Sequence, residues 1–198
     1  MDTTVNVAVF VGSLRKASLN RKMANALAAM APPPLALSIV EIGQLPLYNE
    51  DWEADVPAAV RQFRQKVLTA DALLFVTPEY NRSVPGVLKN ALDVGSRPYG
   101  KRVWNGKPGA VISVSPGAIG AFGANQHLRQ SMVFLDVPML QMPEAYIGHA
   151  NQLFDDKDAL TNDSTRQFLG KFLNAFAGWI ERTRPAPVAP QQREVAAT

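Results

Sequence analysis

The chain has 198 residues, of which 47% are hydrophobic and 19% charged, and its formal net charge is +3. The lack of cysteine excludes disulfides, thiolate metal sites and thiol redox chemistry. The small net charge disfavours nucleic acid as a partner, and no apolar stretch approaches the roughly 20 residues of a membrane-spanning helix. This length fits one domain, so we expect a folded unit over residues 1–184 and a flexible tail over 185–198, which carries too little apolar surface to fold alone.

Short apolar runs alternate along the chain with segments of helical periodicity. The predicted strands are 5–11, 35–42, 72–76 and 110–114, with a weaker fifth strand at either 137–140 or 145–147. The predicted helices, taken from amphipathic spacing, are 23–30, 60–68, 87–92, 125–134 and 168–180. Ser18 or Asn20 is placed to cap the first helix, Pro57 to begin the second, and Pro85 with Gly86 to begin the third.

This order of elements predicts an α/β fold. The strands are continuously hydrophobic rather than alternating, which favours a parallel sheet covered by helices on both faces. With five strands, we expect the flavodoxin-like, doubly wound arrangement with strand order 2-1-3-4-5.

Three unusual loops follow the first, third and fourth predicted strands, at residues 12–20, 77–86 and 113–120. In an open parallel sheet, ligands bind beyond the carboxyl ends of the strands, at the point where the strand order reverses. The three loops are therefore expected to meet at one binding site.

The first loop combines hydroxyls, an amide and a guanidinium where a helix begins. Backbone N–H groups and the helix dipole favour an anion there, so Ser13, Arg15, Ser18 and Asn20 suggest a phosphate site. The alternative is that the hydroxyls and the amide only cap the helix while Arg15 lies in solvent. Neither the P-loop nor the dinucleotide glycine motif is present.

The other two loops suit a flat ring. Pro78, Tyr80 and Asn81 place a rigid residue, an aromatic and an amide together, as a flavin ring would require, although an ordinary turn at a strand end has the same composition. The third loop is rich in glycine, so its backbone can approach a ligand closely, or it forms a tight turn that needs positive φ.

These residues, together with Ser83, Pro85-Gly86 and the segment from Leu88 to Pro98, resemble the NADPH-dependent FMN reductase family over residues 5–180, in particular its quinone and chromate reductase branch. The resemblance implies three groups of FMN-binding residues. Those at the phosphate are Ser13, Arg15, Ser18 and Asn20, those at the ring are Pro78, Glu79, Tyr80 and Asn81, and those in the third loop are Ser115 and Gly117. Two positions depart from the family pattern, because Val94 replaces an aromatic residue and Gly120-Ala121 replaces a pair of glycines.

The activity that the resemblance implies is hydride transfer from NADPH or NADH to FMN, followed by electron transfer to quinones, azo compounds, free flavin or chromate in a ping-pong mechanism. The flavin carries this chemistry, so no catalytic side chain is expected. One alternative is a flavodoxin-like electron carrier that does not oxidise nicotinamide, which a pI near 9.3 disfavours because such carriers tend to be acidic. Another is a binding module for a phosphorylated ligand without redox activity.

The remaining expectations concern metals, partners and location. His127 and His149 lie far apart and lack companion ligands, so no metal site is predicted, and no serine is placed in a G-x-S-x-G motif. The resemblance implies a homodimer or homotetramer, with Arg129 and Glu144 in a network of ion pairs between subunits. Because the start of the chain does not have the pattern of a secretory signal, we expect a cytoplasmic protein without a membrane partner.

Overall fold

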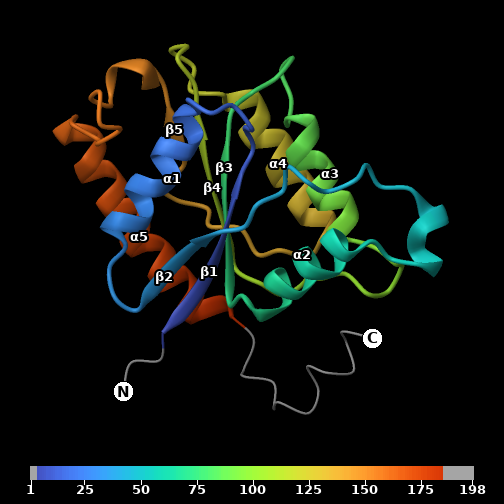
Figure 1. The fold of residues 1–198 in the computed structure, drawn as a ribbon. Helices are drawn as coiled ribbons and strands as arrows, with labels where there is room; N and C mark the ends of the chain where they lie inside the picture. The colour runs from blue at the N-terminus through green and yellow to red at the C-terminus, as the bar shows by residue number, and fades with distance from the viewer. Residues whose placement is uncertain (1–3, 185–198) are drawn as a thin grey trace.

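The computed structural model describes residues 4–184, so the tail predicted over residues 185–198 lies outside the described residues. Five parallel strands form one sheet, and they are β1 (Val5–Val11), β2 (Leu35–Ile39), β3 (Ala72–Thr77), β4 (Gly109–Val114) and β5 (Ala145–Ile147). Their spatial order is β2-β1-β3-β4-β5 (Figure 1), which confirms the predicted flavodoxin-like topology.

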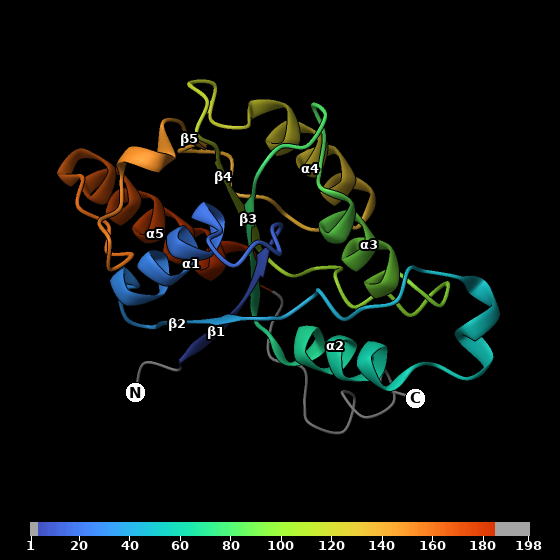
Figure 2. The ribbon, with the colours of Figure 1, turned by 45° about the horizontal axis from the view of Figure 1, so that its top comes forward.

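Helices cover both faces of this sheet. They are α1 (Leu19–Met30), α2 (Ala58–Thr69), α3 (Gly86–Gly95), α4 (Phe122–Phe134) and α5 (Asp163–Thr183), with short 3-10 helices at η1 (Glu50–Ala54) and η2 (Ala150–Gln152). α1 and α5 lie on one face, and α2, α3 and α4 lie on the other (Figures 1 and 2). No helix within residues 4–184 is long and apolar enough to cross a membrane.

The two layers explain why the hydrophobic residues of the strands are not restricted to alternate positions. Val9 and Val11 pack in the apolar cluster under α1 and α5, whereas Ala8 and Phe10 pack in the cluster under α2, α3 and α4. In the second cluster Phe10 stacks on Phe75 with ring centroids 5.3 Å apart. Alternate side chains of one strand thus enter opposite cores, as a parallel sheet buried on both faces requires.

Three of the differences between the predicted and the observed elements have a clear structural reason. β2 ends at Ile39 rather than at residue 42, because Val40 and Ile42 are buried in the following loop. The fifth strand is 145–147, whereas residues 137–140 form a buried loop that packs against Gly109. Ser18 caps α1 by accepting a hydrogen bond from Arg21 N–H at 3.2 Å, and Asn20 lies inside the helix, so the alternative cap at Asn20 was wrong.

Candidate functional site

The register of the central strands brings the three loops to one edge of the sheet. Val11, the last residue of β1, pairs with Val76 of β3, and Thr77, the last residue of β3, pairs with Ser113 of β4. Gly12 N–H then donates to the Val76 carbonyl at 2.9 Å. The loops after β1, β3 and β4 therefore begin at nearly the same level, and all three lie at the top of Figure 1.

The first loop lies against the second with little space between them. A Cβ atom added at Gly12 would lie 3.0 Å from the Thr77 hydroxyl and 3.1 Å from the Pro78 ring. Both distances are tighter than ordinary van der Waals contact. Glycine at this position therefore lets the end of β1 approach the loop after β3.

Asn20 is the buried polar residue of the first loop that lacks a complete set of partners. Its side chain is 4% exposed, and its Nδ2 donates to the Val114 carbonyl at 3.3 Å, which ties α1 to the end of β4. Its Oδ1 is buried and accepts no hydrogen bond within residues 4–184. An unpaired buried oxygen costs free energy unless a ligand donates to it.

Ser13 and Arg15 are also available to a ligand. Ser13 is buried, and its hydroxyl has no hydrogen-bond partner in the described part of the chain. Arg15 is exposed, and its guanidinium makes one hydrogen bond, from NH2 to the Ala17 carbonyl at 3.2 Å. Together with the cap at Ser18, these groups surround the N-terminus of α1, where anions are favoured.

The basic residues of this region divide into two groups. Arg21 binds Glu41 through two bonds of 2.7 Å, which lowers the pKa of the Glu41 carboxyl, and Lys22 pairs with Asp158. Arg15 and Lys16 have no acidic partner within residues 4–184. The first loop thus keeps two positive charges that no carboxylate within residues 4–184 neutralises.

The second loop is a tight two-residue turn. Tyr80 and Ser83 exchange backbone hydrogen bonds of 3.1 and 3.0 Å, and the two residues between them, Asn81 and Arg82, have φ values of 51° and 65°. Two successive positive φ values define a type I′ turn. The Tyr80 side chain is 48% exposed, so its ring is available to a ligand.

Glu79 uses its carboxylate within the protein. Its Oε2 accepts a hydrogen bond from Ala124 N–H in the first turn of α4 at 3.1 Å. A Cβ atom added at Gly123 would lie 2.9 Å from the same oxygen, so glycine is needed for this approach. The sequence placed Glu79 in the site, but it carried no signal for this contact across 45 residues.

The third loop is held by its backbone. Ser115 N–H donates to the Ile147 carbonyl at 2.9 Å, and the Ser115 hydroxyl accepts from Gly117 N–H at 3.1 Å. Residues 116–119 are exposed. The turn needs glycine at position 120, where φ is +62° and an added Cβ would lie 2.6 Å from the Tyr146 carbonyl carbon. At Gly117 an added Cβ would meet only the Ser115 hydroxyl, at 3.5 Å, which is an ordinary contact.

Three residues singled out from the sequence, Arg129, Glu144 and His127, lie outside the three loops. Arg129 is partly buried and donates from Nε to Asn125 Oδ1 at 3.0 Å and from NH1 to the Leu140 carbonyl at 2.9 Å. Glu144 is exposed and makes no ion pair with Arg129 in the described chain. His127 contacts the Ser83 hydroxyl at 3.0 Å, and no group of three or more His, Asp or Glu side chains within residues 4–184 is arranged to hold a metal ion.

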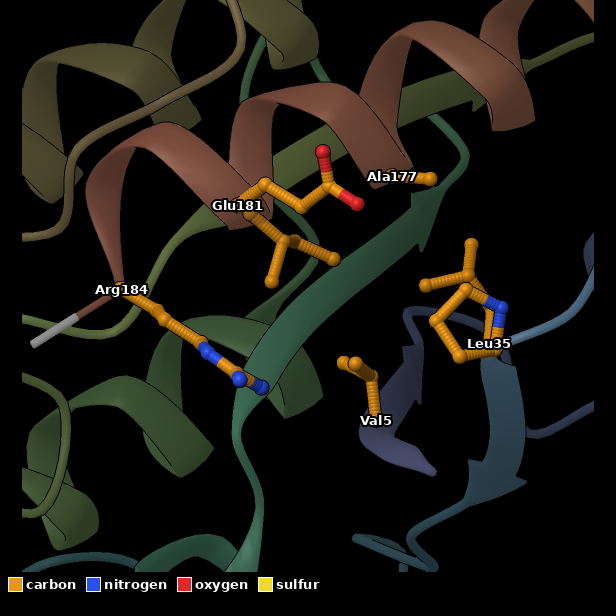
Figure 3. Close-up of a pocket in the computed structure, with 7 residues that line it drawn as sticks. Val5, Leu35, Ala177, Glu181 and Arg184 are labelled. Atoms are coloured by element: carbon orange, nitrogen blue, oxygen red, sulfur yellow. The ribbon is translucent and has the colours of Figure 1, made fainter. Parts of the chain in front are cut away.

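A separate pocket lies at the opposite edge of the sheet. Val5 and Leu35, the first residues of β1 and β2, line it together with Ala177, Glu181 and Arg184 from the end of α5 (Figure 3). Its volume is about 120 Å³. Sites for cofactor-sized ligands usually measure about 300 to 1,000 Å³, so this pocket is too small for one.

The donor set at the carboxyl edge fits a ligand with a phosphate, hydroxyl groups and a flat ring. Arg15, Lys16 and the α1 N-terminus suit a phosphate, the unpaired Asn20 oxygen suits a ligand hydroxyl, and the exposed Tyr80 ring suits a heteroaromatic surface. FMN carries all three features. The fold and the site together define a flavodoxin-like, FMN-binding protein.

Comparison with known proteins gives the family. The family model for NADPH-dependent FMN reductase matches residues 5–152. The chain is 63% identical to a quinone reductase from Pseudomonas putida, across 93% of this chain and 99% of that one, and 47% identical to 2-hydroxy-1,4-benzoquinone reductase from a Burkholderia species, across 91% and 98%. The chain belongs to the NADPH-dependent FMN reductase family.

A solved structure agrees with this assignment. FerB, a flavoenzyme NAD(P)H:(acceptor) oxidoreductase from Paracoccus denitrificans, superposes with a TM-score of 0.87 at 43% sequence identity, covering 92% of this chain and 100% of FerB. The protein is therefore an NAD(P)H-dependent oxidoreductase with FMN as its cofactor. The electron-carrier and the non-redox alternatives are thereby excluded.

Proposed function

We propose that this enzyme reduces quinones at the expense of NADPH or NADH in a ping-pong mechanism. The observation that carries the proposal is the meeting of the three loops at one edge of the sheet, where Arg15 and Lys16 have no acidic partner and Asn20 Oδ1 has no donor among the described residues. The high identity to a quinone reductase supports the choice of acceptor. The overall reaction consumes one NAD(P)H, one proton and one quinone, and it yields NAD(P)⁺ and a hydroquinone.

The proposed FMN-binding residues are those of the three loops. Those at the phosphate are Ser13, Arg15, Ser18 and Asn20; those at the ring are Pro78, Glu79, Tyr80 and Asn81; those of the third loop are Ser115 and Gly117. Because the Glu79 carboxylate bonds to α4, Glu79 acts on the ring through its backbone. The Ser115 backbone is already paired, with its N–H on the Ile147 carbonyl and its carbonyl on Ala150 N–H. Ser115 would therefore act through its hydroxyl, which accepts from Gly117 N–H and keeps its own proton to donate.

FMN, when bound, supplies the group that accepts a hydride from NAD(P)H and delivers two electrons to the acceptor. The protein contributes binding and orientation. Arg15 and the α1 N-terminus would hold the phosphate. The donors available to the polar edge of the ring would be the backbone N–H groups that bond to no group within residues 4–184, namely those of Asn81 and Arg82 in the type I′ turn and of Ala118 and Ile119 in the third loop. These dipoles stabilise the negative charge that develops on reduction, so no side chain acts as acid or nucleophile.

The proposed range of acceptors is broad. Tyr80, Ile119 and Phe122, which belong to the second loop, the third loop and the start of α4, are each about half exposed or more. An open apolar rim discriminates weakly between flat or small oxidants. Azo compounds, free flavin and chromate are therefore proposed as acceptors beside quinones.

The proposal also covers assembly and extent. We place the folded domain at residues 1–184, with the tail at 185–198 outside the site. Arg129 and Glu144 are proposed to contact a neighbouring subunit in a homodimer or homotetramer, since neither residue pairs with the other within its own chain. The enzyme is proposed to work in the cytoplasm, where NAD(P)H is supplied.

The test uses the purified full-length chain with FMN added. Bound FMN should be visible as a flavin absorbance spectrum, which NADPH or NADH bleaches under anaerobic conditions and a benzoquinone then restores. Initial rates measured at several fixed quinone concentrations should give parallel double-reciprocal lines. Intersecting lines would contradict the ping-pong mechanism, and a bleached flavin that quinone does not reoxidise would contradict the choice of acceptor.

A further inference from the structure

Two fully buried polar side chains lie beneath the third loop. Ser113 on β4 and Asn125 on α4 each have 0% exposed surface, although apolar residues dominate both cores around them. Polar groups in such surroundings are costly unless every donor and acceptor is paired. Their hydrogen bonds therefore show what these residues do.

The hydrogen bonds run in one direction. Arg129 Nε can only donate, so the Asn125 atom 3.0 Å away must be its acceptor oxygen. The Asn125 amide nitrogen then faces the Ser113 hydroxyl at 3.2 Å and the Ala145 carbonyl at 3.3 Å. Ser113 Oγ accepts from Asn125 and lies 2.6 Å from the Gly120 carbonyl and 3.4 Å from the Ala145 carbonyl, so its own proton goes to the much nearer Gly120 carbonyl.

This chain of hydrogen bonds ends on the residue that closes the third loop. Gly120 N–H donates to the Gly117 carbonyl at 3.2 Å, so fixing the Gly120 peptide also fixes the turn from Gly117 to Gly120. From the other side, Gly148 lies so close to Ala118 that an added Cβ would be 2.5 Å from the Ala118 carbonyl oxygen. The loop is thus held from the core and from the end of β5.

We infer that Ser113 and Asn125 are positioning residues, which fix the third loop so that the N–H groups of Ala118 and Ile119, which bond to no group within residues 4–184, meet the flavin edge where negative charge develops on reduction. This inference rests on the proposed function, because it takes the third loop to be part of the FMN site. A loop held in this way favours the reduced cofactor over the oxidised one. The side chains act at a distance, through the Gly120 carbonyl.

Ser113→Ala tests the inference with a small change. It removes the donor to the Gly120 carbonyl and leaves Asn125 bonded to Ala145. The matched control is Ser131→Ala, because the Ser131 hydroxyl also donates to one backbone carbonyl, that of His127 at 3.1 Å, but lies outside the loops. Should Ser113→Ala fail to fold, Ser113→Cys keeps a weaker donor at the same position and takes its place.

Two measurements are required for each variant. In the apoprotein, amide hydrogen exchange of the peptide containing residues 116–121 should be several-fold faster in Ser113→Ala than in wild type or Ser131→Ala. In the FMN-loaded protein, Ser113→Ala should weaken the binding of reduced FMN about three- to tenfold more than that of oxidised FMN, which makes the midpoint potential about 14 to 30 mV more negative.

The outcomes separate the two levels of the proposal. If wild type binds no FMN, the proposed function fails. If wild type binds FMN and Ser113→Ala has the same midpoint potential as Ser131→Ala, the positioning role is overturned. This holds even where hydrogen exchange is faster, because a serine with a merely structural role would loosen the loop without changing the preference for reduced FMN.

Discussion

The Glu79 carboxylate bonds to the Ala124 backbone N–H, 3.1 Å away, and so joins the loop after β3 to the first turn of α4. The Glu79 side chain is 13% exposed, and its other oxygen lies 3.5 Å from the Arg82 guanidinium. A carboxylate at this position accepts from an otherwise unpaired N–H and meets the positive end of the helix dipole. The second loop, which contains the type I′ turn, is thereby fixed against α4.

Gly123→Ala should break this link. The new Cβ would lie 2.9 Å from Glu79 Oε2 and 3.1 Å from the Arg82 carbonyl oxygen, so Glu79 must move away from α4. We expect unfolding of the apoprotein to require about 1 to 2 kcal/mol less free energy, which is typical of a lost N-terminal cap, and FMN binding to weaken as well. Urea unfolding and FMN titration measure the two effects.

Glu79→Gln is the matched milder change. Its amide oxygen keeps an acceptor at the same place but carries no charge, so we expect a loss of about 0.3 to 1 kcal/mol from the missing interaction with the dipole. A loss equal to that of Gly123→Ala would mean that the charge, and not the close approach, holds the second loop.

Arg15→Ala should weaken FMN binding by about 1.5 to 3 kcal/mol, because it removes a charge-assisted contact with the phosphate. Riboflavin, which lacks the phosphate, is the control ligand, and its affinity should stay the same. Both affinities can be measured by quenching of flavin fluorescence. Equal losses for FMN and riboflavin would show that Arg15 contacts the ring or the ribityl chain instead.

Asn20→Ala should reduce FMN affinity by about 1 to 3 kcal/mol, since a buried acceptor that the cofactor satisfies is lost. The apoprotein should lose less stability than this, because the substitution removes an unpaired oxygen along with the 3.3 Å bond to the Val114 carbonyl. Calorimetric titration and urea unfolding give the two values. An unchanged FMN affinity would remove Asn20 from the site.

Much of the fold could be predicted because its signals are local. The hydrophobicity of residues 5–11 reflects the two cores into which Val9 and Phe10 point, and the Ser18 hydroxyl directly before α1 marks the start of a helix. The strand order also predicts which three loops meet at the candidate site. These features need only neighbours in the sequence and the rule for parallel sheets.

The rest depends on contacts between distant residues. Residues 137–140 resemble a strand because they are buried, and Met139 does form a single parallel β-bridge with Gly109, but the pairing extends no further and the segment is otherwise a loop. The partners of Glu79 and Asn125 have no local signature either. In the third loop, the sequence indicated a turn that needs positive φ but not at which glycine, and the contact of Gly120 with Tyr146 of β5 shows that it is Gly120.

The Arg21–Glu41 pair predicts a pH effect of known sign. The hydrogen bonds from Arg21 lower the pKa of Glu41 in the folded state, so the pair stabilises the protein above the ordinary pKa of glutamate, about 4.3, and this contribution is lost as pH falls through the lowered value. Glu41→Gln should therefore reduce stability by up to about 1 kcal/mol at pH 7, and the difference from wild type should shrink as pH falls through the lowered pKa of Glu41. Urea unfolding of both proteins across this range measures it, and a difference that grows on acidification would contradict the assignment.

Two glycine-to-alanine changes should act in opposite directions. At Gly120, where φ is +62°, an added Cβ would lie 2.6 Å from the Tyr146 carbonyl carbon, so we expect a loss of at least about 2 kcal/mol in the free energy of unfolding and a displaced third loop. Gly170 lies within α5 with no atom within 4 Å of an added Cβ, so alanine there should stabilise the protein by about 0.5 to 1 kcal/mol. Urea unfolding of the apoproteins measures both changes, and FMN titration should show weaker binding only for Gly120→Ala. A Gly120→Ala protein as stable as wild type would mean that the third loop is free to move away from β5, which would contradict both the close contact and the role proposed for Ser113.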